Sequence, residues 1–119
     1  SNIATAASTS RIIPGAAGMY RVAFSVQLEN TSGAADHIAY IWWRKNGVDI
    51  SNSMGQVYVT KGNRTISAWD NMIQSSNTTD YFELMYAVDD TALIFPYYAA
   101  TAFGPGTAAV FLNIVPVGM

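Results

Sequence analysis

The segment from Gly18 to Asn30 constrains this chain more than any other feature, because apolar side chains occupy every second position. Between them stand mostly small or polar residues, at positions 21, 23, 25 and 27. A period of two is the period of a β-strand with one buried face, and it does not fit a helix, whose period is 3.6. The chain must therefore contain a sheet that buries one face of this strand: Tyr20, Val22, Phe24, Val26 and Leu28.

Further strand-like segments follow at intervals of about 8–12 residues, which is the spacing typical of all-β sandwiches and barrels. Asn46-Gly47 is a strong hairpin signal, because both residues tolerate a positive φ. No segment shows a convincing helical period. The sequence predicts an all-β protein, an antiparallel two-sheet jelly-roll sandwich of about eight strands. The predicted strands after residue 30 are 37–45, with 48–50 as a continuation past the turn, then 56–60, 64–74, 81–88, 92–98 and 108–117.

With 119 residues, the chain is long enough for one core and one domain. Residues 1–17 begin with mostly Ala, Ser and Thr and end near the turn signal Pro14-Gly15, which predicts an extended arm or a weak first strand. Residues 18–119 form the predicted jelly-roll domain. We expect neither a signal peptide nor a membrane span, because the chain shows no such apolar segment.

Charged residues make up only 12% of the chain, about half the usual share of ~25%. A small protein needs its charges to keep its surface in water. Either uncharged polar groups cover this surface, or part of it is buried against partners. The six basic residues form no run longer than Arg44-Lys45, so a nucleic-acid partner is not expected. The absence of cysteine excludes disulfides, thiolate metal sites and cysteine nucleophiles.

Residues suited to catalysis are scarce. His37 is the only histidine, which makes a catalytic triad or a zinc site improbable. Asp89-Asp90 is the only acidic pair, and it fits a turn between strands better than a calcium site. Glu83 and Asp80 are candidates for glycosidase carboxylates, but no pattern selects them. The sequence therefore predicts no enzyme activity, no metal and no cofactor.

Aromatic residues stand in two adjacent pairs. In a strand, neighbouring side chains point to opposite faces, so one ring of each pair can face outward. We predict that these rings contribute to a protein interface; the alternatives are packing under a loop and a platform that stacks on sugars. The candidate interface residues are Trp42, Trp43, Tyr97 and Tyr98.

Three segments resemble a known superfamily. Gly18 to Ser25 (Gly-Met-Tyr-Arg-Val-Ala-Phe-Ser) is similar to a strand of the jelly rolls shared by tumour necrosis factors and complement globular heads. Trp42 to Gly47 (Trp-Trp-Arg-Lys-Asn-Gly) resembles a hairpin of that superfamily, and Asp80 to Leu84 resembles the start of one of its strands. The likeness covers about residues 18–117.

Within that superfamily, small virion proteins of tailed bacteriophages are the most similar. The matching stretches are Ile41 to Ser53, Ala68 to Asn71 and Asp80 to Met85. The resemblance implies a homotrimer with one sheet of each subunit facing the three-fold axis, which would account for the missing charges. It also implies a non-enzymatic structural role and a location in the virion.

The short chain and its Ala/Ser/Thr arm favour a capsid decoration or cement protein that binds other virion proteins. The first alternative is a receptor-binding knob or fibre tip of the phage tail, whose partner is a host glycan or receptor. An alternative of another class is a carbohydrate-binding module, which predicts a monomer with an exposed aromatic platform.

Overall fold

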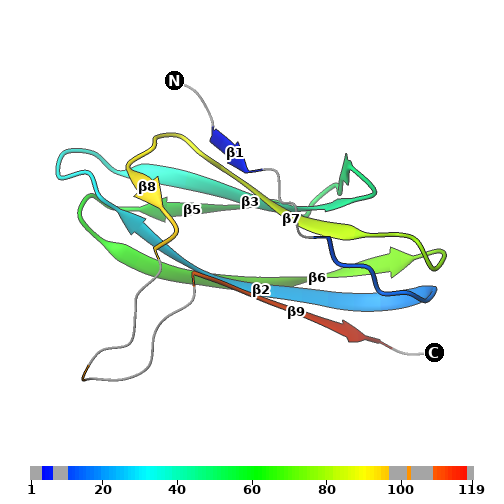
Figure 1. Cartoon of the computed structure of the whole chain (residues 1–119). Coiled ribbons are helices and arrows are strands. Elements are labelled where there is room, and N and C mark those ends of the chain that lie inside the picture. The colour runs from blue at the N-terminus through cyan, green and yellow to red at the C-terminus, as the bar shows by residue number, and fades with distance from the viewer. Residues whose placement is uncertain (1–3, 7–10, 97–101, 103–108, 118–119) are drawn as a thin grey trace.

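The computed structural model describes residues 4–6, 11–96, 102 and 109–117, and within them it contains nine strands and no helix. The strands form two antiparallel sheets that lie face to face (Figure 1). The predicted all-β, two-sheet sandwich is therefore confirmed. We call the two layers sheet A and sheet B.

Sheet A has five strands in the order β1-β7-β3, and the remaining edge of β3 pairs with β5 along its first half and with β4 at its end. Its strands are β1 (Ala4–Ala6), β3 (His37–Lys45), β4 (Val48–Asp49), β5 (Gly55–Val59) and β7 (Phe82–Val88).

Sheet B is built around the long strand β2, which pairs with β6 along one edge and with β8 and β9 along the other. Its strands are β2 (Gly18–Asn30), β6 (Arg64–Ser75), β8 (Leu93–Ile94) and β9 (Val110–Pro116).

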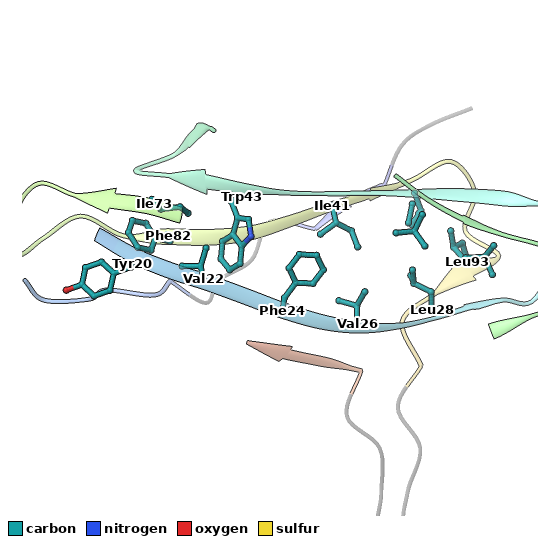
Figure 2. Close-up of a cluster of buried hydrophobic side chains, with 14 residues drawn as sticks. Tyr20, Val22, Phe24, Val26, Leu28, Ile41, Trp43, Ile73, Phe82 and Leu93 are labelled. Atoms are coloured by element: carbon teal, nitrogen blue, oxygen red, sulfur yellow. The ribbon is translucent and has the colours of Figure 1, made fainter. Parts of the chain in front are cut away.

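The alternation in β2 produces the core, as predicted. Its even-numbered side chains point from sheet B toward sheet A, where they meet Ile41 and Trp43 of β3 (Figure 2). Phe24 is central: its ring packs edge-on against Trp69 with the ring centroids 4.4 Å apart, and against Trp43 at 6.3 Å. Because these positions are buried, the odd-numbered residues of β2 form the opposite, outer face of sheet B.

The turn between β3 and β4 also has the predicted form. Asn46 has φ 51° and Gly47 has φ 80°. Positive φ at both central residues is the geometry of the tight hairpin turn that Asn-Gly favours.

Of the predicted strand 92–98, residues 97 and 98 lie outside the described residues, and the described part is a strand only at β8 (Leu93–Ile94). β8 ends at Ile94 and pairs only with Glu29 and Asn30 at the end of β2. Pro96 has no N–H to donate to a ladder, which disfavours strand pairing at that residue.

The N-terminal residues reach the edge of sheet A. β1 pairs with β7, and Ile12 exchanges two backbone hydrogen bonds with Phe82, of 2.9 and 2.8 Å. The guanidinium of Arg11 lies 4.2 Å from the ring centroid of Tyr81, a cation–π distance. The division into an arm (1–17) and a domain (18–119) stays a prediction, since residues 1–3 and 7–10 lie outside the described residues.

Candidate assembly surface

The outer face of sheet B carries little charge. The register of β6 and β9 against β2 places its side chains in five rows of three, each row crossing β6, β2 and β9. Most of these residues are apolar, small or uncharged. The rows are Ile66–Gln27–Ala109, Ala68–Ser25–Phe111, Asp70–Ala23–Asn113, Met72–Arg21–Val115 and Gln74–Met19–Val117.

One ion pair lies within these rows. Arg21 and Asp70 stand 3.7 Å apart on neighbouring strands, and both side chains are half-exposed. Large apolar side chains are exposed around it: Ile66 is 65% exposed, Met72 53% and Phe111 59%. The next row beyond Ile66 carries a second ion pair, Arg64 with Glu29 at 3.5 Å. Exposed apolar side chains gathered on one face whose charges are neutralised in pairs are typical of a contact surface.

The β9 edge, formed by Val110–Pro116 on the side away from β2, adds to this surface. Val110 and Leu112 point to the core side of sheet B, yet they are 42% and 44% exposed. Ile114, further along the strand, packs against the core. The described part of sheet A therefore leaves the sandwich open over the first half of β9.

The two tryptophans face opposite sides of sheet A, as their adjacent positions predicted. Trp43 is fully buried in the core, where its indole N–H has no hydrogen-bond partner among the described residues. Trp42 lies on the outer face of sheet A, is 9% exposed, and packs with Met85 and Ala87.

The interface role predicted for these aromatic pairs stays a prediction. Of its residues, the structure describes Trp42 and Trp43, and only Trp42 reaches an outer face. Its Nε1–H donates to the Asp49 carboxylate at 2.8 Å, and the Nε–H of Arg44 donates to the same oxygen at 2.9 Å. These bonds, that from Trp42 first, lower the pKa of Asp49. Tyr97 and Tyr98 lie outside the described residues.

His37 and the acidic pair Asp89-Asp90 make polar contacts at the start of β3 and in the turn that follows β7. Nδ1 of His37 lies 3.2 Å from the Asp89 carboxylate, which also accepts the backbone N–H of Ile38. Asp90 accepts the backbone N–H of Ala92 at 2.8 Å. This geometry is that of a turn between β7 and β8. In the described part of the chain, no three His, Cys, Asp or Glu side chains gather closely enough to hold a metal ion.

Asp80 and Glu83, the two candidate carboxylates, have different surroundings. Asp80 is 5% exposed and accepts the backbone N–H of Ser76 at 2.7 Å and the side-chain amide of Asn46 at 2.9 Å. These bonds, that from Ser76 first, lower the pKa of Asp80. Asp80 thus ties the β3–β4 turn to the loop before β7, a structural role that sequence reasoning missed. Glu83 lies on β7, in register with Arg44 on the outer face of sheet A.

Within the described residues, no helix is long and apolar enough to cross a membrane. No family model, no curated protein and no solved structure matches this chain.

Proposed function

We propose that this chain is a non-enzymatic structural protein of a tailed-bacteriophage virion, a jelly roll that forms a homotrimer through the outer face of sheet B. The observation that carries the proposal is the composition of that face: five rows of mostly uncharged side chains around one ion pair, with a second ion pair, Arg64 with Glu29, at the end of the face.

The size of the face suits a subunit interface. From Ile66 to Gln74 the rows extend about 27 Å at 3.4 Å per residue, across three strands spaced about 4.8 Å apart. Permanent interfaces between subunits are more apolar than ordinary protein surface. Burying Ile66, Met72 and Phe111 at a three-fold axis removes the largest apolar side chains of this face from water.

The virion role rests on the resemblance of residues 41–53, 68–71 and 80–85 to small phage virion proteins. Within that role we favour a capsid decoration or cement protein, which binds to a larger assembly and needs no reactive group. A receptor-binding knob or fibre tip of the phage tail is the alternative.

The trimer is tested by light scattering behind a sizing column. We expect the unaltered chain to have a mass near three times 12.8 kDa or a multiple of it, and Ile66→Lys, which places a charge in the face, to have a smaller mass. Tyr58→Lys is the matched control, because Tyr58 is 66% exposed, nearly the same fraction as Ile66, but lies on the outer face of sheet A. A monomeric unaltered chain overturns the trimer. A monomer that also binds glycans, and loses them with Tyr58→Ala, favours the carbohydrate-binding module.

The virion role is tested on purified particles of a phage that encodes this chain. We expect its peptides in the particles by mass spectrometry, and an antibody label on the capsid in electron micrographs. A label on the tail favours the knob or fibre tip. Particles without the chain overturn the virion role.

A further inference from the structure

The backbone of β9 has one bonded side and one open side. The carbonyl of Ala109 accepts the N–H of Gln27 at 2.9 Å, and the N–H of Val117 donates to the carbonyl of Met19 at 2.8 Å. In an antiparallel ladder, successive residues direct their backbone groups to opposite sides. The odd-numbered residues of β9 therefore bond to β2, and Val110, Leu112 and Ile114 direct their N–H and C=O groups to the β9 edge. Within the described residues, β9 pairs with β2 alone.

The two edges of sheet B differ in how they are protected. β6, at the opposite edge, carries Arg64 and Asp70, and the ammonium of Lys45 donates to the carbonyl of Gln74 on its open side. β9 has no charged residue from Val110 to Pro116. Natural proteins usually protect an edge strand with charges, bulges or prolines, so that it does not pair with another chain. In β9 only Pro116, its last residue, does so.

We propose that the β9 edge pairs antiparallel with the β9 edge of a second copy of this chain, about a two-fold axis at Leu112. In this register Leu112 lies opposite its own counterpart, and Val110 lies opposite Ile114 of the other copy. All three residues direct their N–H and C=O groups into the new ladder, so each pair exchanges two hydrogen bonds.

The side chains of β9 suit this self-pairing. On the core side, the register sets Leu112 against Leu112 and Val110 against Ile114, which covers the two side chains that one copy leaves 42% and 44% exposed. On the outer side, Phe111 lies opposite Asn113. No like charges meet, because β9 has none. The two copies of sheet B become one continuous sheet.

This contact uses an edge, whereas the proposed trimer uses the outer face of sheet B, so either can exist without the other. Where both form, three-fold and two-fold contacts together join six or more chains.

Leu112→Pro tests the pairing in the full chain by light scattering. Proline removes the N–H of residue 112, which points to the β9 edge, and leaves the bonds from β9 to β2, which belong to odd-numbered residues. We expect the unaltered chain to form two or six copies and Leu112→Pro to halve that number. Leu112→Val, which keeps the N–H and a strand-forming side chain, should retain the unaltered mass.

The outcomes separate the two interfaces. Six copies that fall to three in Leu112→Pro support both contacts. Two copies that fall to one support the β9 pairing and overturn the trimer. Three copies in both proteins overturn the β9 pairing and leave the trimer standing. A monomeric unaltered chain overturns both.

If Leu112→Pro fails to fold, amide hydrogen exchange on the unaltered chain tests the β9 pairing. Among the described residues of a single copy, the amides of Leu112 and Ile114 have no strand partner, whereas those of Phe111 and Asn113 bond to β2 and serve as internal references. Pairing predicts slow exchange at Leu112 and Ile114 at high protein concentration, and faster exchange on dilution. Fast exchange at both residues at every concentration overturns the proposal.

Discussion

Removing the ring of Phe24 should cost the subunit about 4 kcal/mol of unfolding free energy. Phe24 is 3% exposed and packs edge-on against Trp43 and Trp69. Phe24→Ala forfeits the burial of the ring, about 2–3 kcal/mol, and leaves a cavity whose cost grows by about 24 cal/mol per Å³. The indoles on either side come from different sheets, so the cavity cannot close without moving β3 and β6 together.

This loss from Phe24→Ala is a large fraction of the chain's total unfolding free energy. A chain of this length has an unfolding free energy of roughly 6–18 kcal/mol. We would measure it from guanidinium unfolding curves at one fixed protein concentration, because assembly adds concentration-dependent stability. Tyr58→Ala is the control: it also removes an aromatic ring, but the side chain is 66% exposed and should cost little. A loss below about 1 kcal/mol for Phe24→Ala would refute the assignment of this face of β2 to the core.

Three further changes test other parts of the fold. Gly47→Val should cost about 2 kcal/mol, because residue 47 has φ 80°, a region that β-branched residues avoid; an unchanged unfolding midpoint contradicts the turn geometry. Gly55→Ala should cost about 1–3 kcal/mol and alter the near-ultraviolet circular dichroism, because its Cβ would lie 2.6 Å from the Trp69 indole; an unaltered spectrum contradicts that close approach. The lowered pKa of Asp80, caused first by the Ser76 N–H, adds stability that is present above about pH 4 and lost as the pH falls through the lowered pKa. Asp80→Asn should flatten this acid dependence of the melting temperature, and equal acid slopes for both proteins would contradict it.

The sequence predicted those parts of the fold whose cause is local. The alternation in residues 18–30 specifies β2 with its bounds, since the period-two pattern depends only on neighbouring residues. Asn46-Gly47 specifies its turn, because the two residues tolerate positive φ wherever they stand. The prediction of a strand at 92–98 was too long in its described part, because an apolar composition does not show whether a partner strand is available. β8 finds only the last two residues of β2.

The candidate surface could not be predicted, because it depends on register. Ile66 and Met72 on β6 and Phe111 on β9 are distant in sequence, and they share a face only because both strands pair with β2 in one particular alignment. A shift of one residue in either strand would turn these side chains toward the core. The sequence instead predicted an interface at the adjacent aromatic residues, because residues that are neighbours in the chain can be recognised without knowing the register. One of them, Trp43, belongs to the core.

Sheet B carries no net charge, and this predicts how an assembly formed through sheet B responds to salt. The four charged residues of sheet B form two ion pairs, Arg21 with Asp70 and Arg64 with Glu29, at 3.7 and 3.5 Å. Sheet B is therefore neutral, and the net charge of −2 belongs to sheet A and the loops. A contact made by sheet B brings together neutral, mostly apolar surfaces, which screening by salt does not weaken.

The assembled mass should then be the same in dilute buffer and in 1 M sodium chloride, and sulfate should favour assembly because it strengthens the burial of apolar surface. We would measure the mass by light scattering across this range of salt. An assembly that dissociates in sodium chloride must be held by charged groups. Since the charged groups of sheet B are already paired within one chain, that result would place the interface on sheet A or the loops.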